Sequence, residues 1–209
     1  MTVWARCFLS WIVPNSIQQA RWIDTRSSGV LYFFCCAKGG ISTDISFKAA
    51  EGAFNYRAAA IIVHDGKLLV LQDEGIPHDY LPGGRVHLGE QAEAALAREL
   101  REELDISLPP YRLVFMAESF FTLMDTRYHE MCLYYLTEAP PELLIRGDSF
   151  TRIEGSEVHH FRWVTFEELR QLSFFPIFLK ERIFSLPDSP EFISLDSDNP
   201  SSLGTQATG

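Results

Sequence analysis

Three glutamates in the middle of the chain have a spacing that suits metal chemistry. Glu99, Glu102 and Glu103 lie within the segment ARELREEL. If this segment is helical, positions i, i+3 and i+4 place the three carboxylates on one face. Glu99 and Glu103 would then repel each other by roughly 0.2–0.5 kcal/mol in an isolated helix. A bound cation would remove this repulsion, and an all-oxygen ligand set favours Mg²⁺, with Mn²⁺ as the second choice.

The same glutamates could instead form an ordinary solvated helix face, in which Arg98 pairs with Glu102. Two neighbouring features favour the metal site. The turn Pro82–Gly84 comes shortly before the helix, and its glycines let the backbone approach a ligand closely. A stripe of apolar side chains would hold another face of the helix against a core. That stripe consists of Ala92, Leu96 and Leu100.

The spacing resembles the signature of the Nudix hydrolases, G-x5-E-x7-R-E-U-x-E-E-x-G-U, in which U is a bulky apolar residue. The positions in register are Gly84, Glu90, Arg98, Glu99, Leu100, Glu102, Glu103 and Ile106. Asp105 departs from the pattern, because the family usually has glycine there to end the helix in a left-handed conformation. Aspartate tolerates that conformation better than most residues, so we expect an intact site at a small cost in stability.

The resemblance implies that water attacks a phosphorus atom in a diphosphate linkage with the help of a divalent metal. Glu102 and Glu103 would be metal ligands, and the backbone carbonyl of Gly83 would complete the cluster. Glu99 would bind a metal or would orient and deprotonate the water. Arg98 would hold a glutamate in place through a charge-assisted hydrogen bond.

Family members often recruit one more glutamate from a later part of the chain. Glu157 and Glu154 both precede a strand that contains Trp163, and the spacing favours Glu157 as a further metal ligand. An ordinary charged residue at the start of a strand is the alternative. Glu118 and Glu130 are weaker candidates, which we expect to face solvent or to pair with arginines.

Candidate substrate contacts lie outside the signature. Arg57 opens a strand and could contact a substrate phosphate, although a surface ion pair would explain it nearly as well. Tyr80 and Phe120 could stack on a nucleobase, as could Phe121 and Tyr128. Aromatic residues in strands more often belong to a core, so this assignment competes with a purely structural one.

The signature concerns only the diphosphate, so the rest of the substrate stays open. A nucleoside diphosphate linked to another moiety is the first expectation, with a nucleoside triphosphate or the 5′ pyrophosphate of an RNA as neighbours. A homodimer is also compatible with the sequence. The alternative from another class is a non-catalytic sensor that binds a nucleotide sugar. Such proteins usually lose signature glutamates, whereas this chain keeps them all.

Composition narrows the classes of partner. The chain has 209 residues and a net charge of −10, so it lacks the broad basic surface of a nucleic-acid-binding protein. No apolar run approaches the roughly 18 residues that a membrane span needs. The cysteines show neither metal-ligand spacing nor a disulfide pattern, which favours a reducing cytoplasm. They are Cys7, Cys35, Cys36 and Cys132.

Composition also divides the chain into three parts. Residues 1–44 are expected to be a poorly structured N-terminal extension without a catalytic role. Residues 45–186 are expected to form the catalytic domain. Residues 187–209 are rich in Ser, Asp, Pro and Gly, and are expected to be a disordered tail.

Hydrophobic periodicity predicts alternating strands and helices in the middle part, and hence an α/β sandwich in which a mixed β-sheet lies between helices. The resemblance implies the same architecture. An Asp-Gly pair predicts a hairpin turn between the first two strands. The expected strands are 57–64, 67–72, 111–122, 129–136 and 157–164, and the expected helices are 90–104, one capped by Thr165, and 175–184.

Overall fold

The computed structural model of the chain describes residues 43–154 and 157–198, and excludes the side chains of Glu154 and Glu157. The expected N-terminal extension therefore lies outside the described residues, apart from Thr43 and Asp44. The strands are β1 (Ser46–Ala49), β2 (Gly52–His64), β3 (Lys67–Asp73), β4 (Gly83–Arg85), β5 (Tyr111–Leu123), β6 (Thr126–Glu138), β7 (Ser149–Glu154), β8 (Glu157–Thr165) and β9 (Glu191–Asp196). The helices are α1 (Ala92–Leu104), α2 (Pro141–Leu144), α3 (Phe166–Gln171) and α4 (Leu179–Arg182).

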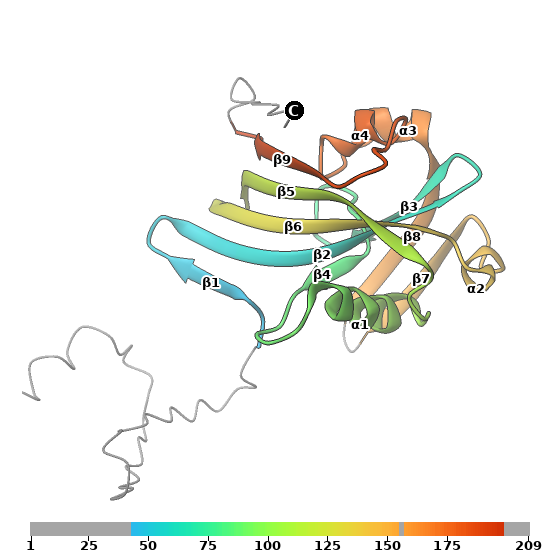
Figure 1. Cartoon of the computed structure of the whole chain (residues 1–209), viewed down its shortest axis with the longest axis horizontal. Helices are drawn as coiled ribbons and strands as arrows, with labels where there is room; N and C mark the ends of the chain where they lie inside the picture. The colour runs from blue at the N-terminus through green and yellow to red at the C-terminus, as the bar shows by residue number, and fades with distance from the viewer. Residues whose placement is uncertain (1–42, 155–156, 199–209) are drawn as a thin grey trace, which may run out of the picture. The chain divides into compact units, whose positions relative to one another are not determined.

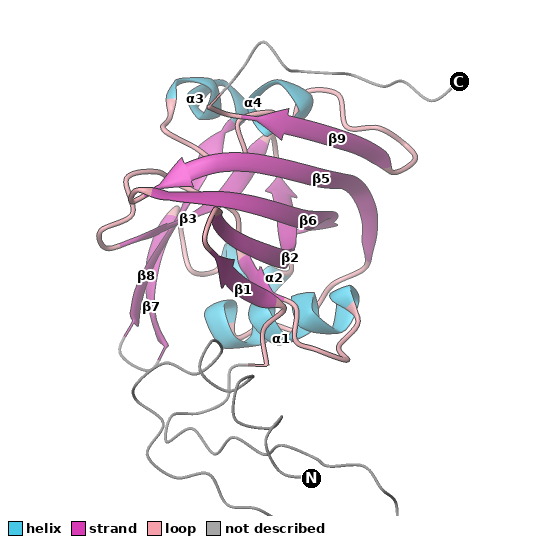
Figure 2. Cartoon of the chain, turned by 90° about the vertical axis from the view of Figure 1, so that its left-hand side faces the viewer, coloured by secondary structure: helices cyan, strands magenta, loops and turns pink. Residues whose placement is uncertain are grey.

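All described strands belong to one mixed β-sheet. Its order is β7-β8-β3-β2-β6-β5-β9, and β1 and β4 both pair with β2. The β2–β6 and β5–β9 pairs are parallel, whereas the other pairs are antiparallel. Helix α1 lies on one side of the sheet and helices α3 and α4 lie on the other (Figures 1 and 2). The predicted α/β/α sandwich with a mixed sheet is confirmed.

Strand β2 lies at the centre and contributes to the core on both faces of the sheet. Ala58, Ala60 and Ile62 are buried in the cluster that includes the apolar stripe of α1. Ala59 and Ile61 are buried in the cluster on the other face, together with residues of α3 and α4. A strand buried on both faces reads as a nearly continuous apolar run, which is why β2 stands out in the sequence.

The end of α1 shows why aspartate can replace glycine in the signature. Asp105 adopts the left-handed conformation, with φ 52° and ψ 45°. Its backbone N–H donates to the carbonyl of Arg101, and the N–H of Ile106 donates to the carbonyl of Leu100. These bonds satisfy carbonyl groups that would otherwise be left free at the end of the helix. The expectation that Asp105 preserves the helix end is confirmed.

Two boundaries differ from the sequence-based expectations. Thr43 and Asp44 belong to the folded unit, because Asp44 forms a β-bridge with His87 and Thr43 accepts a backbone hydrogen bond from Leu88. The expected tail contains β9, which runs parallel to β5 from Glu191 to Asp196. The polar composition of residues 187–209 did not indicate this short strand, because its backbone groups bond to a distant part of the chain.

Smaller elements were also missed or displaced. The structure adds β1, β4, β7 and α2, and it limits the expected last helix to Leu179–Arg182. Such short elements depend on their neighbours more than on local periodicity. No helix in the described ranges is long and apolar enough to cross a membrane.

Candidate active site

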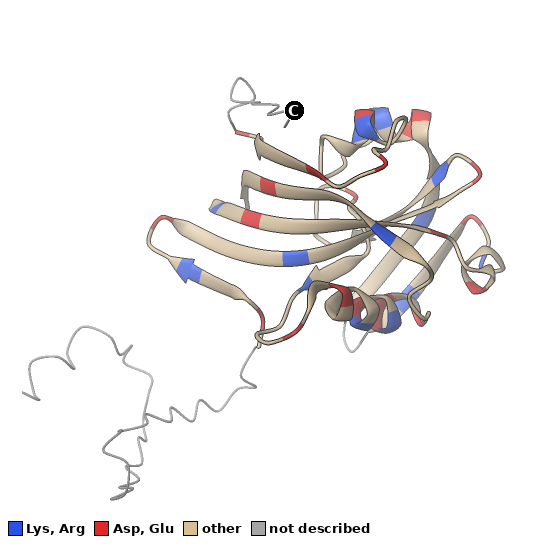
Figure 3. Cartoon of the chain, viewed as in Figure 1, with Lys and Arg blue, Asp and Glu red and all other residues tan. Residues whose placement is uncertain are grey.

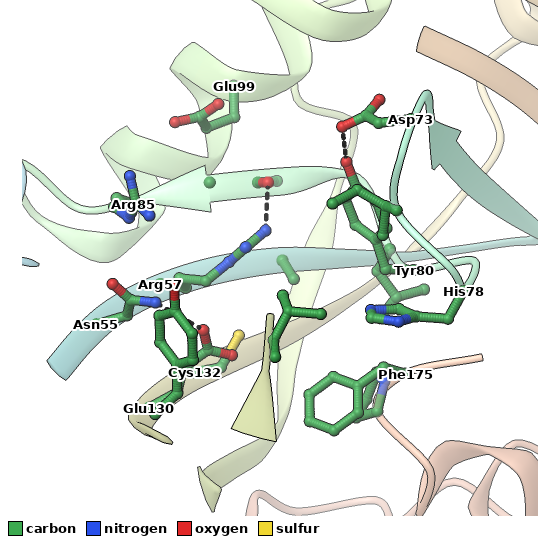
Figure 4. A pocket seen from close by; sticks show the side chains of 18 of the residues that line it. Asn55, Arg57, Asp73, His78, Tyr80, Arg85, Glu99, Glu130, Cys132 and Phe175 are labelled. Atoms are coloured by element: carbon green, nitrogen blue, oxygen red, sulfur yellow. Dashed lines mark hydrogen bonds between the residues drawn. The ribbon is translucent and has the colours of Figure 1, made fainter. Parts of the chain in front are cut away.

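A cavity of about 470 Å³ opens between the signature region and the central strands of the sheet. Its walls come from strands β2 to β6 and β8, from α1, and from the loops that carry Tyr80 and Phe175. Glu99 enters from α1 on one side, whereas Asn55 and Glu130 project from β2 and β6 on the other (Figure 4). The cavity therefore joins the signature to residues that are distant from it in the sequence.

The carboxyl group of Glu99 is held against the backbone of Gly84. A Cβ atom at position 84 would lie 2.2 Å from Glu99 Oε1, so only glycine leaves room for this carboxyl group. The Glu99 side chain is 15% exposed. Burial raises its pKa, against the opposing effect of the hydrogen bond from Arg98. A partly desolvated carboxyl of this kind suits a role as a base or a ligand.

Gly83 joins the other functional side chains to the turn. Its N–H donates to Glu103 Oε2 at 2.9 Å, and its carbonyl accepts from Arg57 Nη2 at 2.8 Å. The φ angle of Gly83 is 130°, and a Cβ atom there would lie 2.3 Å from the carbonyl oxygen of Ala58. A residue with a side chain cannot adopt this backbone position, so the glycine is required for these contacts.

Arg98 connects the glutamates of the signature. Its Nη1 donates to Glu99 Oε1 at 2.7 Å and to Glu102 Oε2 at 3.0 Å. Its Nε and Nη2 donate to Glu90, whose pKa is lowered by this hydrogen bonding. Nη2 also donates to the carbonyl of Arg85. Figure 3 shows that acidic and basic residues lie close together on α1. The expected charge-assisted bond from Arg98 is present and reaches three carboxylates.

The structure separates the three glutamates expected to bind metal. Glu103 is buried and lines the cavity with Glu99, whereas Glu102 is 43% exposed and does not line it. Across residues 43–154 and 157–198, no three His, Cys, Asp or Glu residues are gathered as a metal centre. The donor chemistry nevertheless fits a hard cation, because two carboxylates and the carbonyl of Gly83 border one cavity.

The expected substrate contacts are only partly brought together. Arg57 and Tyr80 line the cavity. Burial lowers the pKa of Arg57, but the charges of Glu130 and Glu103 help to raise it above its usual value, so the guanidinium stays charged. The hydroxyl of Tyr80 donates to Asp73, and burial together with this bond raises the pKa of Tyr80. Arg57 is thus a partly buried residue within the site and not part of a surface ion pair.

Phe120 does not line the cavity, whereas its neighbour Phe121 does. Successive side chains of a strand point to opposite faces, so only one of the two can face the cavity. Phe120 stacks on His129 with ring centroids 4.4 Å apart. Phe121 lies against Tyr128 at 5.2 Å and against Phe175 at 4.8 Å. The structure therefore replaces Phe120 with Phe121 as the aromatic candidate on β5.

Glu157 is the first residue of β8, but its side chain lies outside the description, so its metal role stays a prediction. Glu130 was expected to face solvent or to pair with arginines. It does not face solvent, because it is 6% exposed and lines the cavity, whereas its electrostatic interaction with Arg57 agrees with the second alternative. Its signal in the sequence was the two-residue spacing from Tyr128 on the same face of a strand. Glu118 lies outside the cavity and bonds His129 at 3.0 Å.

Asp73 and His159 also line the cavity and were not expected there. His159 Nδ1 lies 2.7 Å from Asp73 Oδ1. The two residues come from β3 and β8, which are adjacent in the sheet and are paired at these positions. No local pattern in the sequence predicts this contact, because it depends on the pairing of two strands that are far apart in the chain.

The chain matches one family model and several solved structures. The family model described as NUDIX domain matches residues 55–183, from within β2 to beyond the end of α4. No curated protein matches the chain. The MutT NUDIX hydrolase from Burkholderia pseudomallei is 26% identical, with a TM-score of 0.44, and the match covers 55% of this chain and 84% of that chain.

Two further solved structures resemble the chain. The MutT protein from Bacillus halodurans is 16% identical with a TM-score of 0.49, and the match covers 69% of this chain and 92% of that chain. The NUDIX domain of NrtR from Shewanella oneidensis, crystallised with ADP ribose, is 20% identical with a TM-score of 0.46. That match covers 66% of this chain and 88% of the other.

Proposed function

Because the chain belongs to the Nudix family, matched over residues 55–183 of its 209, we propose that it is a metal-dependent pyrophosphohydrolase. Its substrate would be a nucleoside diphosphate linked to another moiety or a nucleoside triphosphate, with the 5′ end of an RNA as a neighbouring candidate. The cysteine pattern and the absence of long apolar runs in the sequence support a cytoplasmic location as part of this proposal.

One observation carries the proposal. The carboxylates of Glu99 and Glu103 and the carbonyl of Gly83 border the same cavity. Arg98 holds the Glu99 carboxylate in place through a hydrogen bond. Diphosphate oxygens repel an attacking nucleophile, so hydrolysis requires positive charge at this place. Nudix hydrolases generally use a divalent metal, for which Mg²⁺ and then Mn²⁺ suit these oxygen donors best.

The residues at the cavity that would hold the metal are Glu103 and the Gly83 carbonyl, with Glu99 either as a ligand or as the base. Glu102, which is exposed, and Glu157 are further candidates. Bound there, the metal would neutralise phosphate charge and lower the pKa of the attacking water. The chain itself positions these groups. Arg98 orients Glu99 and Glu102, and Arg57 fixes the Gly83 carbonyl.

Glu99 is the residue best suited to take the proton of the attacking water. Its carboxyl group is only 15% exposed, and burial raises its pKa toward the range in which a carboxylate accepts protons effectively. Tyr80 and Arg57 border the same cavity and would contact the substrate there. Arg57 carries the positive charge that an anionic substrate needs in a chain whose net charge is −10.

Incubation with a panel of nucleotides and Mg²⁺, followed by mass spectrometry of the products, tests the proposal. We expect cleavage at a diphosphate linkage, with ¹⁸O from labelled water appearing in one product. Addition of EDTA should stop the reaction. Binding of nucleotides without turnover of any of them would instead favour the non-catalytic sensor, and so would refute the enzymatic function.

A further inference from the structure

The wall of the cavity opposite the signature carries a buried acid for which the proposed hydrolysis has no use. Glu130 is 6% exposed, and its hydrogen bond from Asn55 Nδ2 is long, at 3.4 Å. Figure 4 shows both residues across the cavity from Glu99. A buried carboxyl group is costly unless it has good partners, and burial raises the pKa of Glu130 accordingly.

Arg57 does not account for this acid by itself. One of its terminal nitrogens donates to the carbonyl of Gly83, and its charge acts on Glu103 as well as on Glu130. Ser119 pairs with Glu130 across β5 and β6. Within the part of the chain that the structure describes, the Ser119 hydroxyl is buried without a hydrogen-bond partner. Ser119 is 1% exposed and does not line the cavity, so the residue through which a ligand could meet this part of the sheet is Glu130.

Asn55 limits which groups of a ligand would fit here. Its Oδ1 accepts from Ser46 Oγ at 2.8 Å, and its Nδ2 faces Glu130. The carboxyl of Glu130 lines the cavity, and its hydrogen bond from Asn55 is long, at 3.4 Å. A carboxylate only accepts hydrogen bonds, so the complementary ligand group is an N–H or O–H donor.

An aromatic surface lies next to this acid. Tyr128 precedes Glu130 by two residues on the same face of β6, and its ring is parallel to that of Phe121 within 11°. Phe175 also lines the cavity and packs against Phe121, with ring centroids 4.8 Å apart. Flat rings bind to such surfaces by stacking, which requires no particular pattern of hydrogen bonds. Together, the carboxyl of Glu130 and these aromatic rings would favour a ligand whose flat ring also carries N–H or O–H groups.

We propose that Glu130 determines substrate specificity by accepting hydrogen bonds from N–H or O–H groups on the organic half of the substrate, whose ring lies against Tyr128 and Phe121. This inference rests on the proposed function, because it concerns the same cavity. A substrate analogue that lacks the donor would leave the buried acid unpaired. The value of kcat/KM for this analogue should therefore be about tenfold lower or more.

The test uses pairs of nucleotides that differ in one donor group: GTP with ITP, which lacks the amino group, and ATP with dATP, which lacks a ribose hydroxyl. We would measure kcat/KM with Mg²⁺ and, separately, Kd by calorimetry in EDTA. The wild-type protein should prefer the donor-bearing member of at least one pair about tenfold or more. In Glu130→Met, which removes both acceptor oxygens, this preference should fall below about threefold, with the analogue bound as well as before.

Glu118→Met is the matched control, since Glu118 lies on the adjacent strand, outside the cavity. It should keep the wild-type preference. If Glu130→Met keeps the preference too, or if it weakens both members of each pair equally while lowering thermal stability, Glu130 is only a counter-ion and the proposal is wrong. Binding with the expected preference but without turnover would support Glu130 and refute only the hydrolase function. Absence of nucleotide binding would overturn the specificity proposal.

Discussion

Gly84 and Glu99 are packed so closely that a methyl group at position 84 would lie 2.2 Å from a carboxyl oxygen of Glu99. The displaced atoms would be the end of a flexible side chain, so Gly84→Ala should move the carboxyl group and leave the fold intact. We expect kcat to fall about 100-fold, as a displacement of about 1 Å in a catalytic group can cause. Steady-state kinetics with circular dichroism would measure both effects.

The double variant Gly84→Ala/Glu99→Ala separates this steric effect from other causes. Removal of the Glu99 carboxyl leaves nothing for the new methyl group to displace. The double variant should therefore be no less active than Glu99→Ala alone. If the two substitutions reduce activity independently, the close contact between them is not what makes glycine necessary at position 84.

Glu103→Gln should abolish most activity without unfolding the protein. Glutamine retains an oxygen that accepts the N–H of Gly83 but loses the negative charge. We expect Mg²⁺-dependent phosphate release to drop by at least about 100-fold with an unchanged circular dichroism spectrum. Glu93→Gln, on the same helix but outside the cavity, is the control. Full activity of Glu103→Gln would remove Glu103 from the proposed ligand set.

Arg98→Lys should lower kcat because lysine cannot reproduce the branched set of bonds to three glutamates. The guanidinium donates to Glu90, Glu99 and Glu102 at once, whereas an ammonium group is a single point charge. Loss of a positioning residue of this kind typically costs about 10- to 100-fold. Arg101→Lys on the same helix serves as the control. Equal effects of the two substitutions would contradict a specific role for Arg98.

Glu130 should make the stability of the protein depend on pH. Burial raises its pKa in the folded state, so the folded protein retains this proton to a higher pH than the unfolded chain does. Its contribution to stability is therefore complete below the unfolded pKa, about 4.3, and is lost as pH rises through the folded pKa. The Tm of Glu130→Gln, measured by calorimetry, should rise relative to that of the wild-type protein as the pH is raised above about 4.3.

Glutamine at position 130 cannot ionise, so the difference in Tm between Glu130→Gln and the wild-type protein should grow as the pH rises. Glu118→Gln should show no such trend, because the Glu118 side chain is 31% exposed and is therefore less buried than Glu130. A Tm difference for Glu130→Gln that is constant with pH, or that shrinks as pH rises, would contradict the buried carboxyl described above.

Deletion of residues 1–42 should leave activity within about twofold of the full-length protein, a change of under 0.5 kcal/mol in the activation barrier. Deletion of residues 1–44 should be more damaging, because it removes Asp44, which lines the cavity and lies 3.3 Å from His87. Kinetics and thermal melts of both truncations would measure this difference. Loss of activity from a folded 1–42 deletion would show that the extension has a catalytic role.

Local patterns in the sequence predicted the parts of the fold that depend on neighbouring residues. Asp65 and Gly66 form the expected turn between β2 and β3, with φ angles of 45° and 72°. Thr165 caps α3, and its hydroxyl and the Glu168 side chain bond each other's backbone N–H groups. Both features are determined within a few residues, so the amino-acid types alone indicate them.

The parts that were missed depend on residues far apart in the chain. Phe121 and Phe120 are equivalent in sequence, and only the pairing of β5 with β6 decides which one faces the cavity. Glu130 lies in a strand whose buried face could not be assigned without knowing that β2 pairs with β6. Helical spacing likewise does not show that Glu103 is buried whereas Glu102 is 43% exposed, and the metal role of Glu102 stays a prediction.

Strand β9 has a practical consequence for any shortened version of the protein. It bonds along β5 from Phe115 to Phe120, and Arg127 anchors it through ion pairs with Asp196 and Asp198. Removal of residues after 186 would uncover one edge of β5 and leave its N–H and C=O groups free to template self-association into aggregates. Expression clones intended for crystallisation should therefore extend through Asp198.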